Sequence, residues 1–403
     1  MPKADWLQGT SAAFRLVIAT SWLAPDWWQE SQDKAIREAI EAGPDWTEYL
    51  FLIDRHRTPA LSWAALSRVS GIPIPEHTKR ELQKRSDACR INAVEHCMLL
   101  AQVLKHFNLA GIPVMSLKGP LFSYELYGDI GLRHSRDLDL EIAEEDLERA
   151  QTCLESKNWQ LDSSFFPMTL RQWESFLQKE HEINFVHSPT GIILELHWRN
   201  DWETSAATRA LWARSVVSVW QGCSIQAMSP GDMTLYLSNH GAAHAWIRAK
   251  WLGDLARAHT LGRLDWPAAW DEARRSGQEN VVLAGLCLLG ALYGLPLPAL
   301  PLLGNACPGP SSRLIKVPLQ ALRNPAGNIR ASLRNGLRLV VYERLLWPRR
   351  SWLAGLSRLL YRREDFRALP LPDELFWAYA PLRPILWAWR KMRCGRTAEG
   401  RTV

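Results

Sequence analysis

The stretch LKGPLFSYELYGDIGLRHSRDLDLEI, residues 117–142, decides the predicted fold. Its last six residues, 137–142, alternate acidic and apolar side chains with a period of two, which is typical of a half-buried β-strand. Residues two apart on a strand point to the same face of a sheet, so Asp137 and Asp139 are expected to lie side by side. Two carboxylates placed in this way can hold the same divalent cation or a pair of cations.

The residues before this strand predict a phosphate-binding turn. Residues 112–117 form a short apolar run rich in strand formers, and a helix is expected to start just after Lys118 and Gly119. The first backbone N–H groups of such a helix are free to bind phosphate. Arg133 and Arg136 lie just before the acidic strand, where they could neutralise charge on a phosphate chain.

Further strands and one helix follow the acidic strand. Residues 144–159 predict a helix, and residues 182–187 and 191–200 predict a hairpin joined by a Ser-Pro-Thr-Gly turn. Glu195 in the second of these strands is a candidate third carboxylate. His197 shares its strand face, where it could orient Glu195, contact a substrate phosphate, or be a buried histidine bonded to the backbone.

The rest of the chain reads as helices, over residues 10–110 and again from residue 229 onward. Residues 280–298 are very apolar, but Gly294 and Pro296 end them after about 14 residues, short of the roughly 20 that span a bilayer. We therefore expect a buried helix there and an α+β fold overall, with a small mixed sheet. The predicted organisation is an N-terminal helical region (1–100), a nucleotide-binding type of core (101–222), a helical domain (223–310) and a basic helical arm (311–403).

The composition is that of a soluble globular protein. Of the 403 residues, 47% are hydrophobic and 22% are charged, and the 21 Trp are scattered as expected for residues that fill cores and interfaces. The seven Cys show no paired spacing, which favours reduced thiols in the cytoplasm and argues against a disulfide framework or a zinc site. The first residues do not resemble a secretory signal.

Positive charge is concentrated at the C-terminus. Residues 330–403 contain 16 Lys and Arg against 6 Asp and Glu, a net charge of +10, whereas the rest of the chain has 32 against 36, a net of −4. This arm, in which Arg recurs among Leu and Trp, has three interpretations. It is a helical cap whose Arg side chains lie over apolar surface, a segment that contacts an anionic membrane from the cytoplasmic side, or a surface for an acidic partner or nucleic acid.

Several of these stretches together resemble a known family. Residues 117–142, followed by IILELHWRN (192–200) and HGAAHAWIRAKWLGDLARAH (240–259), are similar to the bacterial uncharacterised nucleotidyltransferase family of the DNA polymerase β-like superfamily. The resemblance extends over roughly residues 50–297 and includes RHRTPAL (55–61). It implies a metal-dependent transferase in which Asp137, Asp139 and Glu195 bind Mg²⁺ or Mn²⁺ and an NTP is the substrate.

The chain also departs from the superfamily. Pro120 stands where the second residue of the phosphate turn is usually Ser, and the interval from Gly119 to Asp137 is longer than in the smallest members. Lys118 is expected to supply the missing phosphate contact.

Two groups in the segment 240–259 have open roles. His240 and His244 share a helix face, where they could bind metal, contact substrate or serve structure. Arg248, Lys250 and Asp254 form either the wall of a nucleotide or acceptor pocket, or a solvated charged face, and the resemblance favours Asp254 slightly.

We expect the protein to transfer a nucleoside monophosphate from an NTP to a hydroxyl or phosphate of an acceptor that the sequence does not identify. A peptide natural product, a saccharide, RNA and a protein are all compatible acceptors, because the fold does not choose among them. Two alternatives remain open: a phosphotransferase, and a non-catalytic binding protein of the same fold that uses its basic arm on a membrane or an acidic partner.

Overall fold

The computed structural model describes residues 6–7, 9–163, 165–200, 202–298, 312–324, 333–348 and 360–398. Within them, helices surround one seven-stranded sheet of order β3-β4-β5-β2-β1-β7-β6. The strands are β1 (Met115–Ser116), β2 (Asp137–Glu141), β3 (Trp159–Leu161), β4 (Glu182–His187), β5 (Ile193–His197), β6 (Val216–Trp220) and β7 (Cys223–Ala227). The β2–β5 and β1–β7 pairs are parallel and the other pairs are antiparallel. The sheet is therefore mixed, and the α+β prediction is confirmed.

The acidic strand and the hairpin lie where the sequence predicts them. β2 starts at Asp137, and β4 and β5 are joined by a turn in which the backbone N–H of Gly191 donates to the carbonyl of His187 at 2.8 Å. The strand predicted over residues 191–200 is shorter in the structure, where β5 spans Ile193–His197. The two strands that carry the candidate carboxylates are thus in place.

Three details differ from the sequence prediction. The strand expected at 112–117 is reduced to the two residues of β1, because Pro113 has no N–H to give to a ladder. The helix expected over 144–159 ends earlier, because Asn158 takes a left-handed conformation (φ 63°) and Trp159 enters β3.

The third difference is a hairpin formed by β6 and β7, which we did not predict. Gln221 and Gly222 both have positive φ (51° and 77°), as a two-residue hairpin turn requires. Because β7 pairs with β1, the sheet extends beyond residue 222, the boundary predicted for the core.

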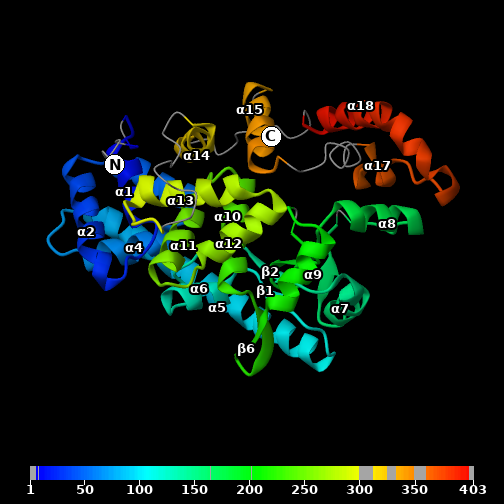
Figure 1. The fold of residues 1–403 in the computed structure, drawn as a ribbon, viewed down its shortest axis with the longest axis horizontal. Helices are drawn as coiled ribbons and strands as arrows, with labels where there is room; N and C mark the ends of the chain where they lie inside the picture. Colours follow the sequence, from blue (N-terminus) through cyan, green and yellow to red (C-terminus); the bar gives the residue numbers. More distant parts are fainter. Residues whose placement is uncertain are drawn as a thin grey trace.

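Two groups of helices form the body next to the sheet (Figure 1). α6, which follows β1, packs against α5 and α11. The helices are α1 (Ala12–Thr20), α2 (Asp26–Glu41), α3 (Trp46–His56), α4 (Pro59–Arg68), α5 (Glu76–Leu109), α6 (Pro120–Tyr127), α10 (Pro230–Ala243), α11 (Ala249–Thr260), α12 (Trp266–Ser276) and α13 (Glu279–Tyr293). α13 is the apolar helix predicted to be buried. It ends at Gly294 (φ 65°), and most of its side chains lie in the body's core.

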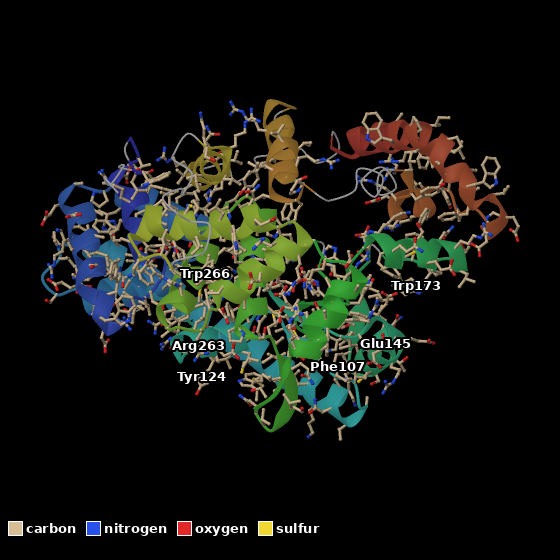
Figure 2. The ribbon with its side chains drawn as sticks, in the orientation of Figure 1. Phe107, Tyr124, Glu145, Trp173, Arg263 and Trp266 are labelled. Atoms are coloured by element: carbon tan, nitrogen blue, oxygen red, sulfur yellow. The ribbon has the colours of Figure 1, made fainter. Side chains whose placement is uncertain are left out.

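A second core lies under the sheet. Leu138 and Leu140 of β2 point away from the acidic face and pack with Phe107 of α5, which is fully buried (labelled in Figure 2). η1 (Glu144–Asp146) and α7 (Leu147–Glu155) complete this part, whereas α9 (Ser205–Arg214) packs with the body's core through Leu211. The alternation of β2 thus divides its side chains between an apolar core and a charged face.

The described part of the C-terminal arm is helical and packs on the rest of the molecule. α14 (Arg313–Arg323) and α15 (Leu333–Leu346) pack on α13, whereas α17 (Arg363–Ala368), η3 (Asp373–Ala378) and α18 (Tyr379–Ala398) lie near α8 (Leu170–Lys179) (Figure 1). Gln172 of α8 donates to the Tyr379 hydroxyl at 3.1 Å.

This arrangement is the one expected for a helical cap. The membrane and nucleic-acid interpretations stay predictions, and much of the arm falls outside the described residues. None of the described helices is both long enough and apolar enough to cross a bilayer.

Candidate functional site

Strand pairing brings the candidate carboxylates together. β2 and β5 run parallel with Asp139 directly opposite Glu195. Asp137 is two residues earlier on the same face of β2, at the point where the strand begins. The predicted juxtaposition of these three acids therefore follows from the register of two neighbouring strands.

Asp139 is held by the turn that precedes α6. Its side chain is 3% exposed, and its Oδ1 lies 2.9 Å from the Lys118 ammonium. Gly119 follows with φ 94°, a conformation that side chains rarely adopt, and leads directly into Pro120. Burial would raise the pKa of Asp139, but the charge of Lys118 and the contact with His197 hold it well below its usual range. Lys118 thus serves the carboxylate cluster in this structure.

His197 joins the same cluster from β5. Its Nε2 lies 3.7 Å from Asp139 Oδ1 and 3.8 Å from Glu195 Oε2, and its ring is nearly buried. Burial would lower the pKa of His197, but the carboxylates of Asp139 and Glu182 raise it above its usual value. The ring of His197 thus lies beside Asp139 and Glu195, and its role stays a prediction.

The acids crowd one another in a way that suits a divalent cation. Burial and the charges of Asp139 and Glu182 raise the pKa of Glu195 to about 8. Ligand atoms of Asp139, Glu195 and His197 all lie within 4.8 Å of one another, while Asp137 is half-buried at the edge of the group. A hard cation with oxygen ligands would neutralise this surplus charge, so the residues fit Mg²⁺ or Mn²⁺.

Cationic side chains gather beside Asp137. We refer to Arg57, Arg136, Arg248 and Lys250 as the cation cluster. Burial and the charge of Arg248 lower the pKa of Arg57 to about 10, and burial and the charge of Arg136 lower that of Arg248. Lys250 is 5% exposed, donates to the carbonyl of His134 at 3.0 Å, and has a pKa held well below its usual value by burial and by Arg133.

The mutual repulsion of these cations is larger than their attraction to nearby carboxylates, as the lowered pKa values of Arg57, Arg248 and Lys250 indicate. An anion with several charges, such as a triphosphate, would relieve that repulsion. Arg136 is exposed at the start of β2, where it is open to such a ligand.

Arg133 and Asp254 form a separate, buried ion pair. Arg133 Nε donates to Asp254 Oδ2 at 2.9 Å, and both side chains are 2% exposed. Arg133 also lies over the Phe122 ring at 5.3 Å. This pair ties the segment before β2 to α11. In this structure the guanidinium of Arg133 binds the carboxylate of Asp254. A contact of Arg133 with phosphate stays a prediction.

The model of a family described as uncharacterised nucleotidyltransferase matches residues 42–294, more than half of the chain. The chain belongs to this nucleotidyltransferase family. A search of curated proteins found no match, and a search of solved structures found none. Membership supports a transferase that uses an NTP.

Two more acids of this nucleotidyltransferase, Glu141 of β2 and Glu203 between β5 and α9, were not predicted from the sequence. Glu141, the last residue of β2, is fully buried and accepts hydrogen bonds from Trp212 Nε1 at 2.7 Å and Asn200 Nδ2 at 3.3 Å. Burial raises its pKa, and burial together with Glu141 raises the pKa of Glu203 to about 7. The D-x-D-x-E alternation could have pointed to Glu141.

The paired histidines lie near the cluster without joining it. His240 and His244 pack against each other and against Trp251, with ring centroids 4.8–5.3 Å apart. Neither belongs to a group of candidate metal ligands among the described residues. Burial and the charge of Lys118 hold the pKa of His240 well below its usual value, which indicates a neutral ring beside the site.

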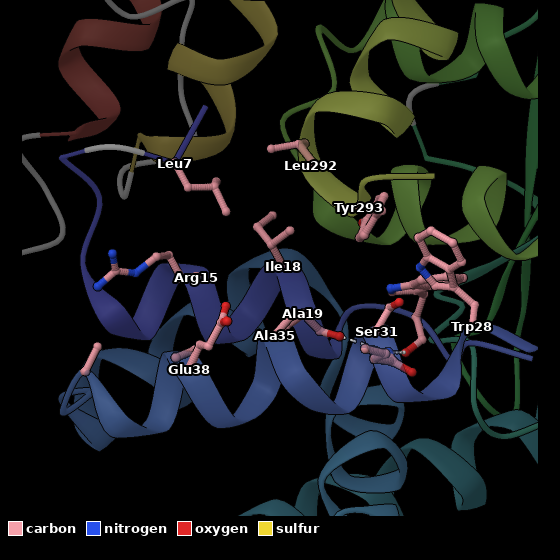
Figure 3. Close-up of a pocket in the computed structure, with 14 residues that line it drawn as sticks. Leu7, Arg15, Ile18, Ala19, Trp28, Ser31, Ala35, Glu38, Leu292 and Tyr293 are labelled. Atoms are coloured by element: carbon pink, nitrogen blue, oxygen red, sulfur yellow. Dashed lines mark hydrogen bonds between the residues drawn. The ribbon is translucent and has the colours of Figure 1, made fainter. Parts of the chain in front are cut away.

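A cavity of about 320 Å³ lies elsewhere in the nucleotidyltransferase, between α1, α2 and the end of α13 (Figure 3). Arg15 and Glu38 lie at one end and Trp28 and Tyr293 at the other. Its described lining is distinct from the carboxylate and cation clusters.

Sequence reasoning did not single out three further residues near the acids. Arg57 lies within the segment 55–61 of the family resemblance, Glu182 is the first residue of the predicted strand 182–187, and His181 precedes that strand. A histidine–glutamate pair at the start of a strand is a weak signal alone, because only the pairing of β4 with β5 places it beside His197.

Proposed function

We propose that the protein transfers a nucleoside monophosphate from an NTP to a hydroxyl or phosphate of an acceptor, with the help of divalent metal ions. The observation that carries this proposal is the register that sets Asp139 opposite Glu195, next to a cluster of insufficiently compensated cations. Negative ligands for a metal and positive ligands for phosphate are then side by side.

Asp137, Asp139 and Glu195 would hold the metal. When bound, Mg²⁺ or Mn²⁺ neutralises charge on the phosphates and lowers the pKa of an attacking hydroxyl. The Lys118 ammonium lies beside Asp139 Oδ1 and holds this carboxylate in its ionised form.

The chemistry requires one bond to form and one to break. The acceptor oxygen forms a bond to the α-phosphorus, the bond from that phosphorus to the bridging oxygen of the β-phosphate breaks, and pyrophosphate leaves. Where the acceptor is a hydroxyl, its proton would pass to the carboxylate of Glu195, which lies directly opposite Asp139. Most of the rate acceleration in such a transfer comes from positioning and electrostatics.

The cation cluster would bind the triphosphate. Arg136 and Arg248 offer guanidinium groups to the phosphate oxygens, together with Lys118 and Gly119 at the start of α6. We assign Arg133 and Asp254 a positioning role, since their mutual ion pair holds the β2 segment against α11.

The test uses the full chain with Mg²⁺, α-³²P-labelled or γ-³²P-labelled NTPs, and fractions that contain peptides, saccharides, RNA or proteins. Label transferred from the α position, and lost in Asp137→Ala, supports the proposal. Metal and NTP binding should be measured in parallel by calorimetry, so that a missing acceptor is distinguished from a missing active site.

Two results would replace the proposal. Transfer of label from the γ position would identify a phosphotransferase, whose phosphate-binding requirements are similar. Absence of both metal and NTP binding would favour the non-catalytic alternative, and binding of the chain to anionic vesicles would then support a membrane role for its basic arm.

A further inference from the structure

His197 lies close to a second histidine and a glutamate, His181 and Glu182, on the Nδ1 side of its ring. Glu182 Oε2 lies 3.5 Å from His181 Nε2 and 3.4 Å from His197 Nδ1. The three ligand atoms lie within 4.8 Å of one another. We refer to these three residues as the His181 triad. It is separated from the Asp139 side of the cluster by the imidazole ring of His197.

The spacing of the His181 triad fits a small tetrahedral metal ion. Zinc binds nitrogen and carboxylate oxygen at roughly 2.0–2.1 Å, so neighbouring ligand atoms of a tetrahedron lie about 3.3–3.4 Å apart. The two distances to Glu182 Oε2 are close to that value, at 3.5 and 3.4 Å. The distances from His197 Nε2 to Asp139 and Glu195 are longer, at 3.7 and 3.8 Å.

His197 has the surroundings of a metal-binding histidine. Its side chain is 8% exposed, and neither ring nitrogen has a hydrogen-bond partner among the described residues. Nδ1 faces Glu182, whereas Nε2 faces Asp139 and Glu195. Histidines that bind a metal through one nitrogen commonly direct the other N–H to a carboxylate, which fixes the ring and raises its basicity. Asp139 is placed to be that carboxylate.

The backbone fixes the position of the His181 triad. The N–H of Trp198 donates to the carbonyl of His181 at 3.0 Å, which continues the β4–β5 ladder by one step. Arg199 donates to the carbonyls of Gln178 and Glu180, at 2.5 and 2.7 Å, and so ties the end of α8 to β5. α8, which carries Trp173 in Figure 2, is in turn covered by the C-terminal helices.

We propose that His181, Glu182 and His197 form a zinc-type transition-metal site distinct from the proposed Mg²⁺ site. The side chains of His181 and Glu182 are 27% and 29% exposed, so a water molecule or a substrate atom can complete the coordination. Two imidazoles and one carboxylate favour Zn²⁺ over Mg²⁺, which prefers oxygen ligands. The site uses none of the seven cysteines on which the sequence argument against zinc rested.

Occupation of this site would hold His197 in one tautomer, with its Nε2–H directed at the proposed catalytic acids. The transition metal would therefore position Asp139 and Glu195 without taking part in the transfer.

The experiment uses the full chain, stripped with a chelator and then titrated with Zn²⁺ or Co²⁺ in excess Mg²⁺. Wild-type protein should bind one Zn²⁺ per chain, and Co²⁺ should give the strong visible absorption of a tetrahedral complex. His181→Gln and Glu182→Gln should each weaken Zn²⁺ binding at least about 100-fold. His187→Gln is the matched control, since His187 lies at the other end of β4 from Glu182 and its Nδ1 is 3.0 Å from the Thr190 hydroxyl.

Asp139→Asn separates this proposal from the proposed function. It should lower the rate of label transfer by about 10³-fold while the Zn²⁺ stoichiometry stays at one per chain. Zn²⁺ binding that survives His181→Gln and Glu182→Gln but is lost in an Asp139→Asn, Glu195→Gln double variant would overturn the proposal. So would a chain that binds no Zn²⁺, in which case His197 is an imidazolium paired with carboxylates on both sides.

Discussion

Two buried ion pairs lie close to each other in this nucleotidyltransferase, and their surroundings differ. Lys118–Asp139 and Arg133–Asp254 both span 2.9 Å, and the acid of each pair is almost fully buried. Around Asp139 the charges do not balance, since Glu195, Glu182 and Asp137 add negative charge. Around Asp254 the pair is closed in the sense that one guanidinium faces one carboxylate, and the nearby Lys250 adds no negative charge.

The comparison shows that a buried ion pair does not reveal its role by its own geometry. A closed pair leaves nothing for a ligand to neutralise, whereas an acid with a surplus of negative neighbours can accept a cation. We therefore assign the first pair to chemistry and the second to positioning. The predictions below test that distinction.

The largest effect is expected for Asp139→Asn. Removal of this charge should lower the rate of nucleotidyl transfer by about 10³-fold, because the carboxylate acts where charge develops in the transition state. The neighbouring acids still compensate Lys118, so the free energy of unfolding should change less than in Asp254→Asn. Labelled-NTP assays and urea denaturation give the two quantities. Comparable activity in the variant and the wild type would remove Asp139 from the proposed mechanism.

Asp254→Asn should show the opposite balance. It leaves the Arg133 guanidinium buried without a counter-charge, and we expect a loss of about 3 kcal/mol in the free energy of unfolding. Replacing both members, as Arg133→Met with Asp254→Leu, should recover most of that loss. A double variant as unstable as the single one would show that the pair contributes more than mutual compensation.

Much of this comparison could be predicted from the sequence, because it depends on local patterns. The alternation at residues 137–142 predicts β2 and the shared face of Asp137 and Asp139, and the turn after residue 187 predicts the β4–β5 hairpin. That β5 lies beside β2 was a reasonable expectation for a small sheet. The pattern at 137–142 also contained Glu141.

The rest depends on contacts between distant segments, which no local pattern encodes. Arg133 and Asp254 are 121 residues apart, and only the packing of α11 against the segment before β2 pairs them. Arg57 reaches the cation cluster from the end of α3, in a left-handed conformation (φ 57°) that the RHR segment does not announce. The β6–β7 hairpin was missed because its turn, Gln221-Gly222, lacks the Asn or Asp usual at such turns.

A smaller effect is expected for Arg136→Ala, which tests whether the cation cluster beside the acids binds the triphosphate. Arg136 is exposed, so its removal should leave the fold intact and raise the KM for NTP about tenfold, the value of one charged hydrogen bond. Arg209→Ala, at an exposed position on α9, is the matched control and should leave KM unchanged. Equal KM values for the two variants would place the triphosphate elsewhere.

The last effect is a dependence of stability on pH, and it concerns the buried side chain of His56. His56 is fully buried, and its Nδ1 accepts a hydrogen bond from the backbone N–H of Ala249 at 3.1 Å. Burial and the charges of Arg55 and Arg248 lower its pKa to about 3. The unfolded chain therefore takes up a proton near pH 6.5 that the folded chain refuses, so stability is full above that pH and declines as the pH falls toward 3.

Below pH 6.5, this one histidine should lower the free energy of unfolding by about 1.4 kcal/mol per pH unit. Urea denaturation between pH 7 and pH 4 measures this change. His56→Gln should be less stable at pH 7 but show a flatter dependence on pH. His77→Gln should keep the wild-type slope, because His77 is exposed in the folded chain as it is in the unfolded one. If the free energy of unfolding of His56→Gln still changes with pH as it does in the wild type, the acid sensitivity does not come from His56. It would then come from protonation of the carboxylates in the buried ion pairs.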